Sequence, residues 1–181
     1  MNTLTASDLN AALPYCFDNE IDWFHTTAQE LPKGSHCVIL GSGPGLMCLA
    51  LLESNADLNL FSIDRDPTVV DTFNKHLHAG GFHVPPYIGD TCDPFPMELF
   101  GEESVDLLVV DADHSYEAVK RDIEHWINKV RYGGLVFFHD YIDIEQNGTN
   151  GVRRAIDDSL TDEWQEVDQV GISIVYRRVN P

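Results

Sequence analysis

The sequence predicts an α/β protein built on a mostly parallel sheet. Two observations support this prediction: short apolar runs alternate with stretches of helical periodicity, and several runs end in acids or glycines. Continuous apolar runs of this length are typical of strands buried on both faces, and intervening helices join such strands in parallel through right-handed crossovers. The carboxyl ends of the strands should therefore share one edge, where open α/β sheets bind ligands.

The segment from residue 105 to residue 141 shows this alternation most clearly. Its first apolar run, Leu107 to Val110, predicts a strand. From Tyr116 onward apolar residues recur at spacings of three and four, which predicts a helix, and we expect Gly133 and Gly134 to end it. Leu135 to Phe138 should form the next strand.

Polar side chains follow both of these strands. Asp111, Asp113 and His114 come after the first, and His139 and Asp140 come after the second. Several titratable groups at one sheet edge favour a functional site. The alternative is structural, in which Asp113 caps a helix, His114 packs at its start and the His139–Asp140 pair binds loop backbone.

Length and charge limit the function further. A chain of 181 residues suits a single domain, for which we expect a helical lead-in over residues 1–33 and a core over residues 36–179. Thirty acids against eleven lysines and arginines give a net charge of −19, which disfavours nucleic acids and anionic membranes as partners. A neutral or cationic small-molecule substrate fits better, although the same acidity also serves solubility.

Cysteine usage and hydropathy predict a cytoplasmic protein. The four cysteines show neither C-x-x-C pairs nor metal-ligand spacing, so we expect reduced, packed thiols. The first twenty residues lack the features of a signal peptide, and no apolar run is long enough to cross a bilayer. Within the lead-in, Thr5 or the Ser7–Asp8 pair should cap a first helix that covers the sheet or closes over a ligand.

A glycine-rich turn follows the first predicted strand, His36 to Leu40. The turn reads Gly41-Ser42-Gly43-Pro44-Gly45 and precedes a helical run from Leu46 to Leu52. Glycines let the backbone approach a ligand, and a helix amino terminus favours negative charge. We therefore place a cofactor at Gly41, Ser42, Gly43 and Gly45, although tight turns use glycine too.

A second apolar run, Leu58 to Ile63, ends at Asp64, about 20 residues beyond the glycine turn. A carboxylate at this distance commonly accepts hydrogen bonds from both ribose hydroxyls. Asp64 is therefore our ribose ligand. Arg65 is a further candidate at the cofactor, although it and Asp66 also suit ordinary loop charges, with Asp66-Pro67 opening a helix.

The remaining elements complete the α/β pattern. A helix over Val69–Leu77 carries His76 and His78, which we expect to face solvent, and a short strand at Tyr87–Ile88 precedes Asp90 and Thr91. These two residues either meet a base ring or cap a turn. The other expected elements are a loop at Asn147–Asn150, a helix over Val152–Leu160, and a hairpin of Trp164–Val167 and Ile172–Val179 with its turn near Asp168–Gly171.

Two motifs make the chain resemble the class I S-adenosylmethionine-dependent methyltransferases over residues 36–179. They are Asp111-Ala112-Asp113-His114-Ser115-Tyr116 and the double glycine followed by His139-Asp140-Tyr141. Within that class the chain looks most like the metal-dependent O-methyltransferases typified by macrocin-type sugar methyltransferases and cephalosporin-hydroxylase-like proteins. This resemblance implies a Rossmann-like, doubly wound, mostly parallel seven-stranded sheet with an antiparallel C-terminal strand.

The resemblance also implies roles for individual residues. It places S-adenosylmethionine against Gly41, Gly43, Gly45, Asp64, Asp90, Thr91 and Asp111. It makes Asp111, His139 and Asp140 the ligands of a divalent metal, Mg²⁺ or Mn²⁺, and Asp113 or His114 the catalytic base. The implied reaction is methylation of a hydroxyl on a small molecule such as a sugar.

Two other functions remain open from the sequence. A non-catalytic cofactor-binding or partner subunit is favoured by the short chain and by Leu40, which stands where the resembled family usually has an acid. A nicotinamide-dependent oxidoreductase is disfavoured by the spacing of the glycines. Because the chain lacks an obvious substrate-recognition insertion, we expect the lead-in or the partner of a homodimer to complete the acceptor pocket.

Overall fold

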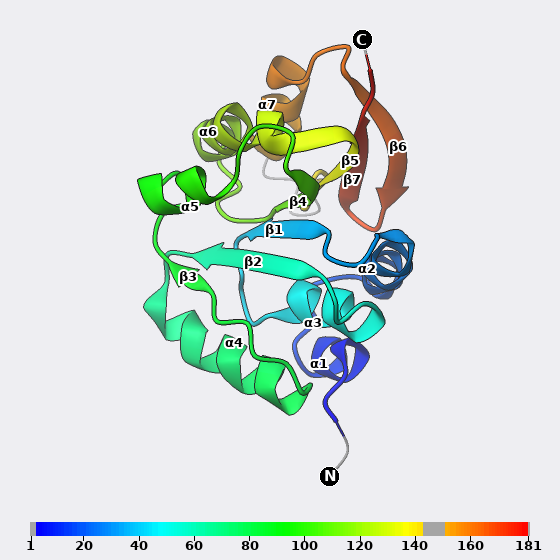
Figure 1. Ribbon diagram of the computed structural model, residues 1–181, viewed down its shortest axis with the longest axis vertical. Coiled ribbons are helices and arrows are strands. Elements are labelled where there is room, and N and C mark those ends of the chain that lie inside the picture. Colours follow the sequence, from blue (N-terminus) through cyan, green and yellow to red (C-terminus); the bar gives the residue numbers. More distant parts are fainter. Residues whose placement is uncertain (1–2, 143–150, 181) are drawn as a thin grey trace.

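The computed structural model describes residues 3–142 and 151–180, which form a sheet between two layers of helices (Figure 1). The strands are β1 (His36–Leu40), β2 (Asn59–Asp64), β3 (Tyr87–Ile88), β4 (Val105–Val110), β5 (Val130–Phe138), β6 (Trp164–Val170) and β7 (Ser173–Arg178). The helices are α1 (Ala6–Ala12), α2 (Asp18–Glu30), α3 (Leu46–Ser54), α4 (Pro67–Ala79), α5 (Pro94–Leu99), α6 (Tyr116–Trp126), the 3₁₀ helix η1 (Ile127–Lys129) and α7 (Gly151–Ser159). Among these helices, none is long and apolar enough to cross a membrane.

The strand order confirms the predicted fold class. The sheet runs β3-β2-β1-β4-β5-β7-β6, with β1 to β5 parallel and β7 antiparallel to both of its neighbours. The chain winds in one direction from β1 to β3 and in the other from β4 onward. The switch point between β1 and β4 is where such sheets open a crevice at their carboxyl ends.

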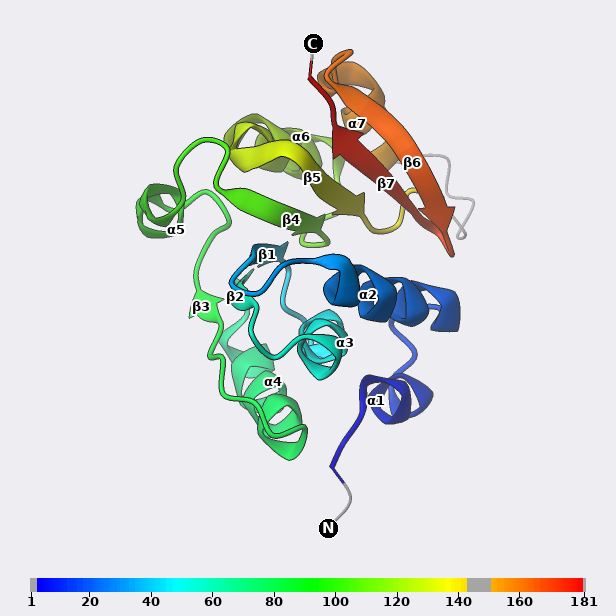
Figure 2. The ribbon, with the colours of Figure 1, turned by 45° about the vertical axis from the view of Figure 1, so that its right-hand side comes forward.

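Alternating side chains of the central strands form one core on each face of the sheet. In β1, Cys37 and Ile39 belong to the core beneath α1 to α4, whereas Val38 and Leu40 belong to the core beneath α5 to α7. Figures 1 and 2 show α1, α3 and α4 on one side of the sheet, and α6 and α7 on the other. Leu40 is fully buried, so its position before the glycine turn is one of core packing.

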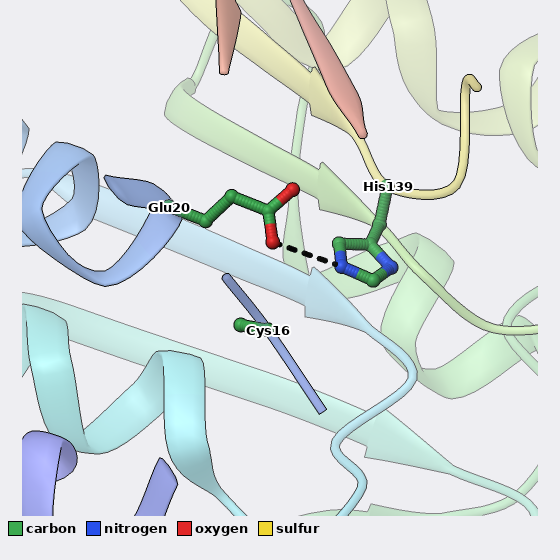
Figure 3. Close-up of side chains that lie close together, drawn as sticks. All are labelled: Cys16, Glu20 and His139. Carbon is green, nitrogen blue, oxygen red and sulfur yellow. Dashed lines mark ion pairs between the residues drawn. The ribbon is translucent and has the colours of Figure 1, made fainter. Parts of the chain in front are cut away.

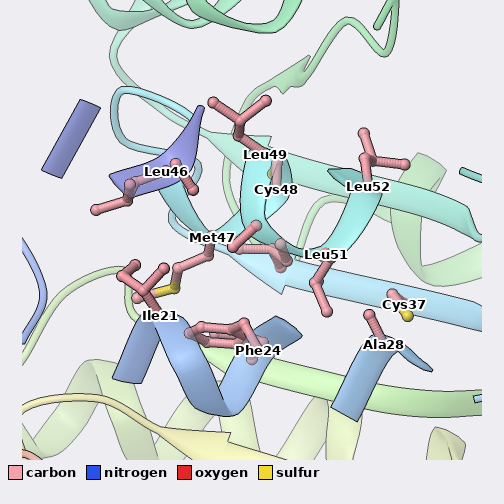
Figure 4. Close-up of a cluster of buried hydrophobic side chains, with 14 of the residues drawn as sticks. Ile21, Phe24, Ala28, Cys37, Leu46, Met47, Cys48, Leu49, Leu51 and Leu52 are labelled. Atoms are coloured by element: carbon pink, nitrogen blue, oxygen red, sulfur yellow. The ribbon is translucent and has the colours of Figure 1, made fainter. Parts of the chain in front are cut away.

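The lead-in covers the first of these cores. Thr5 is the N-cap of α1 and forms a capping box with Asp8. This confirms Thr5, one of the two caps predicted for the first helix. Phe24 and Ile21 of α2 pack against Met47 and Leu51 of α3 (Figure 4). Burying these side chains fixes α2 beside the amino end of α3, close to the glycine turn.

The predicted role of the double glycine is wrong. Helix α6 ends at Trp126 without it, and Gly133 and Gly134 lie inside β5. The register between β4 and β5 shifts from Val105↔Val130 to Leu107↔Leu135, which is a β-bulge. Gly133 has a φ of 78°, and a Cβ on Gly134 would collide with backbone oxygens. Glycine is favoured both at a β-bulge and after the end of a helix, so the sequence alone did not distinguish these two structures.

Two smaller predictions also need correction, and one helix was missed. The hairpin strand β6 continues beyond the predicted end at Val167 to Val170, which pairs with Ser173, so the turn lies at Gly171 and Ile172. His76 does not simply face solvent, because its Nδ1 lies 2.8 Å from the carbonyl oxygen of Pro44. Helix α5 was not predicted, since its six residues include two prolines. The predicted loop at Asn147–Asn150 lies outside the described residues.

Candidate active site

A cavity of about 1230 Å³ opens at the carboxyl edge of the sheet, at the switch point between β1 and β4. Its lining comes from the segments that follow β1 to β5 and from the linker between α1 and α2. Among the residues predicted from sequence, the lining includes Gly41, Ser42, Gly43, Asp64, Arg65, Asp90, Thr91, Asp111, Asp113, His114, His139 and Asp140. The structure thus gathers every candidate site residue except Gly45 around one space.

The three glycines of the turn have different roles. A Cβ on Gly41 would collide with the backbone oxygen of Asp111, so this glycine allows β1 and β4 to end side by side. A Cβ on Gly45 would meet the side chains of Leu77 and Phe73, so Gly45 serves packing beneath α4. A Cβ on Gly43 would meet no described atom within 4 Å and would project into open space. Only Gly43 leaves room for a ligand that a side chain would displace.

Asp64 holds this turn in place. Its Oδ2 accepts a hydrogen bond of 3.0 Å from the backbone amide of Gly43, and its Oδ1 accepts one of 3.0 Å from the amide of Asp66. A carboxylate offers about four acceptor sites, so each oxygen of Asp64 retains one for a further donor. The geometry suits both fixing the turn and accepting hydroxyl groups.

Asp90 and Thr91 are fixed by helix α6. Asp90 pairs with Arg121 at 3.0 Å, and the Thr91 hydroxyl donates to the buried carboxylate of Asp122. The carbonyl oxygen of Thr91 accepts from Trp126 Nε1 at 2.9 Å. Burial raises the pKa of Asp122. The hydroxyl of Thr91 is therefore directed into the protein, and this residue lines the cavity with its remaining atoms.

Arg121 and Asp122 were not found from sequence. A signal was present, because Asp122 lies on the buried stripe formed by Val119, Ile123 and Trp126. An acid on such a stripe needs a buried donor, and Thr91 supplies it.

Asp113 and Arg65 form an ion pair of 3.3 Å across the mouth of the cavity. The other oxygen of Asp113 accepts a hydrogen bond of 3.0 Å from the amide of Ser115, at the start of α6. These contacts lower the pKa of Asp113, chiefly through Ser115. A carboxylate with two such partners is a poor proton acceptor, so the structure favours a structural role for Asp113, but the N-cap residue of α6 is Ser115.

His114 and His139 bridge the same two carboxylates. His139 Nδ1 lies 3.2 Å from Oδ1 of Asp111 and 2.9 Å from Oδ2 of Asp140. His114 approaches the same two oxygens, Nε2 at 3.3 Å from Asp111 and Nδ1 at 3.3 Å from Asp140. The imidazole of His114 is half exposed, whereas that of His139 is buried. We call these four side chains the outer cluster.

The electrostatics of the outer cluster follow from this arrangement. Burial, the largest influence, pushes the pKa of Asp111 upward, but hydrogen bonds to His114 and His139 outweigh it and lower that pKa. The pKa of His114 is raised, first by its hydrogen bond to Asp111. Asp140 has a φ of 53°, an uncommon backbone conformation for a residue other than glycine. Such strain is concentrated at functional sites.

The outer cluster has the donor chemistry of a divalent metal site. One ligand atom from each of Asp111, His139 and Asp140 lies within 4.8 Å of the others. Carboxylate oxygens with imidazole nitrogen suit Mn²⁺, Fe²⁺ or Zn²⁺ better than the all-oxygen preference of Mg²⁺. The residues present therefore fit a divalent cation.

A second cavity of about 640 Å³ shares lining residues with the first at the α1–α2 linker. Tyr15, Cys16, His139 and Asp140 line both cavities, and Phe17 and Ile172 line the second one. Tyr15 and Phe17 expose 61% and 48% of their surfaces. The lead-in thus both covers the core and contributes to the site, which the sequence predicted only as alternatives.

Comparison with known proteins identifies the fold and family. A family model described as a methyltransferase domain matches residues 38–141, which is more than half of the chain. The chain belongs to this family. The match spans the glycine turn, Asp64 and the whole outer cluster, so the site described above lies within the methyltransferase domain.

Solved methyltransferases have the same fold. The O-methyltransferase TomG from Streptomyces achromogenes, crystallised with S-adenosylmethionine, gives a TM-score of 0.73 at 16% identity, over 97% of this chain and 88% of that protein. An O-methyltransferase from Bacillus cereus, crystallised with S-adenosylhomocysteine, gives 0.70 at 13% identity, over 97% and 89%. At these identities the likeness concerns the fold.

Two curated proteins are similar in sequence. A tRNA N(3)-methylcytidine methyltransferase, trm141 of Schizosaccharomyces pombe, is 27% identical over 168 residues, or 88% of this chain. An uncharacterised protein of Sinorhizobium fredii, y4gI, is 45% identical over 47 residues, or 26% of this chain. The chain spans 65% of the length of the first and 5% of the second.

Proposed function

We propose that this methyltransferase transfers the methyl group of S-adenosylmethionine to a hydroxyl of a small molecule, with help from a divalent cation. The observation that carries the proposal is that His139 and Asp140 line both cavities. An acceptor in the smaller cavity therefore meets, at the outer cluster, a methyl donor in the larger one. Holding two reactants in this relation supplies much of the rate acceleration.

The larger cavity suits the cofactor. Gly43 leaves the space that an adenosyl group needs, and Asp64 retains acceptor sites for the ribose hydroxyls. We assign contact with the base to Asp90, which lines the same cavity and is held by Arg121. S-Adenosylmethionine, when bound, supplies the methyl group, and a divalent cation supplies the positive charge that acidifies the acceptor hydroxyl.

The chain's own residues then handle the acceptor and its proton. Asp111, Asp140 and His139 Nδ1 hold the cation, and exposed Tyr15 and Phe17 provide ring faces for a cyclic acceptor. His114 is the base that accepts the hydroxyl proton. It is half exposed, and a cation held by Asp111 and Asp140 would occupy the carboxylates that raise its pKa, whereas Asp113 is paired with Arg65.

A radiolabel assay tests the proposal. The protein is incubated with methyl-labelled S-adenosylmethionine, Mn²⁺ and either a catechol, a panel of sugars, or bulk tRNA. We expect label in a small-molecule acceptor and none in tRNA, because a net charge of −19 repels a polyphosphate. Label in tRNA alone would support an activity like that named for the fission yeast relative, and label in no acceptor despite cofactor binding would support the non-catalytic alternative.

A further inference from the structure

We propose that Cys16, Glu20 and His139 form a second cation site, suited to Zn²⁺, on the inner side of His139. This site goes beyond the proposed function, because it includes two residues of the lead-in and faces away from the outer cluster. Its three residues come from the α1–α2 linker, the first turn of α2 and the residue after β5. Figure 3 shows Glu20 reaching toward the ring of His139, with Cys16 close to both.

The three donors converge in a buried position. One ligand atom from each residue lies within 4.8 Å of the others, and the residues are 8%, 0% and 5% exposed in chain order. A thiol, a carboxylate and an imidazole are the ligand types of Zn²⁺ and, by ligand softness, a poor set for Mg²⁺.

The two nitrogens of His139 have different surroundings. Nδ1 faces Asp111 and Asp140 of the outer cluster, as described above. Nε2 is buried and makes no hydrogen bond to any described residue; it lies 3.5 Å from Oε2 of Glu20. Each buried polar atom without a partner needs an explanation, and an ion is one of the few available.

The spacing of the inner donors is that of an ion pair, longer than a hydrogen bond, and it also fits a shared cation. An N–H···O bond is about 2.7–3.2 Å long, so 3.5 Å is too far. Two ligands at about 2.0–2.2 Å from a tetrahedral Zn²⁺ lie about 3.3–3.6 Å apart. The distance between His139 Nε2 and Glu20 Oε2 matches the second geometry.

Other contacts orient the inner ligands. Oε1 of Glu20 accepts hydrogen bonds from the Ser173 hydroxyl at 2.6 Å and the Ile172 amide at 3.2 Å, and its Oε2 accepts from the Phe17 amide at 2.8 Å. With Nε2 as ligand, His139 donates its Nδ1–H to Asp140, as metal-bound histidines commonly do toward a carboxylate.

The charges of the inner ligands balance the charge of the ion, and the ion has a route to the site. Zn²⁺ binding releases the thiol proton of Cys16 to solvent, and the resulting thiolate and the Glu20 carboxylate together balance the two positive charges. An ion reaches the site from either cavity, because both are lined by Cys16 and His139.

The inner and outer sites share one imidazole. A neutral imidazole has a single lone pair, so an ion on Nε2 leaves Nδ1 protonated and removes one ligand from the outer cluster. Zn²⁺ at the inner site should therefore weaken cation binding at the outer one.

Cobalt substitution tests the inner site. Co²⁺ is titrated into the chelator-treated full chain, and the near-ultraviolet charge-transfer absorption of a cobalt thiolate is recorded. We expect this absorption in the parent protein and in Cys92→Ser, and its loss in Cys16→Ser. No absorption in a folded parent protein, or absorption that persists in Cys16→Ser, would overturn the proposal.

A stability measurement tests the same site with zinc itself. Saturating Zn²⁺, at about 100 times its dissociation constant, should stabilise the parent by about 2.7 kcal/mol and raise its midpoint of thermal unfolding. Cys92→Ser should respond like the parent, and Cys16→Ser and Glu20→Gln should respond much less. Equal responses in all four proteins would contradict the inner site. Neither measurement requires methyl transfer, so a failed proposed function would leave both readouts interpretable.

Discussion

The backbone amide of Gly43 donates a hydrogen bond of 3.0 Å to Oδ2 of Asp64. This bond joins the turn after β1 to the end of β2, the neighbouring strand on the side away from β4. The acid that we assign to the ribose is thus also the residue that holds the glycine turn open. Cofactor recognition and the shape of the turn therefore depend on one carboxylate.

Replacing Asp64 by Ala should weaken S-adenosylmethionine binding by about 1.5–3 kcal/mol, the range for hydrogen bonds to a charged group. The loss has two sources, the ribose contacts and the freed amide of Gly43. Calorimetry measures it, and Asp66→Ala is the control, because Asp66 caps α4 through Thr68 and should affect stability alone. Unchanged affinity in a folded Asp64→Ala protein would make Asp64 a structural acid only.

Replacing Gly43 by Val should abolish cofactor binding, since the side chain would project into the cavity. Gly81→Val is a matched control, because Gly81 also has a positive φ and no described atom within 4 Å of a Cβ, yet it does not line the cavity. Each variant should lose about 1–2 kcal/mol of stability through backbone strain. Equal cofactor affinities for the two variants would remove the glycine turn from the binding site.

Asp122 should make stability depend on pH. Burial raises its pKa, so the folded state holds a proton that the unfolded state has released, and stability falls as pH rises between the ordinary and the raised pKa. Each tenfold difference in proton affinity between the two states corresponds to about 1.4 kcal/mol of unfolding free energy. Urea unfolding over a pH series should show Asp122→Asn gaining stability relative to the parent across this window, after which the difference between the two should stay constant. A difference that is flat or shrinks with rising pH would contradict the assignment.

Replacing His114 and Asp113 one at a time should show which of them is the catalytic base. Replacing His114 by Gln should lower kcat by about 10²–10⁴, the usual contribution of a general base, with little change in cofactor affinity. Asp113→Asn should mainly disturb the ion pair with Arg65 and the start of α6, and so change kcat much less. Single-turnover assays measure both rates. A larger loss of rate in Asp113→Asn than in His114→Gln would make Asp113 the base.

Much of this site was predictable because it depends on local patterns. An apolar strand followed directly by an acid or a histidine fixes where that side chain stands, and parallel pairing brings the strand ends together. Asp64, Asp111 and Asp140 were placed in this way. The same reasoning did not reveal that Gly41 and Gly45 serve packing. The sequence of a turn does not show which neighbouring atoms lie against each of its glycines.

The sequence predicted that the lead-in could reach the site, but not which of its residues would do so. Glu20 contacts Ile172 and Ser173, more than 150 residues away, and no periodicity links them. The collision of a Cβ on Gly171 with Glu20 is equally non-local. Contacts of this kind depend on how α2 packs on α3. The sequence pattern predicts that α2 has an apolar face, but it does not predict what that face packs against.

The most direct test of the outer cluster is the rate of methyl transfer as a function of Mn²⁺ concentration, measured for the parent and for Asp140→Ala after chelator treatment. We predict that the parent is inactive without metal and recovers with Mn²⁺. Asp140→Ala should need far more Mn²⁺ and recover only partly, because Asp111 and His139 remain as ligands, while its affinity for S-adenosylmethionine is largely kept. Full activity of both proteins in chelator would contradict the outer cluster as a cation site.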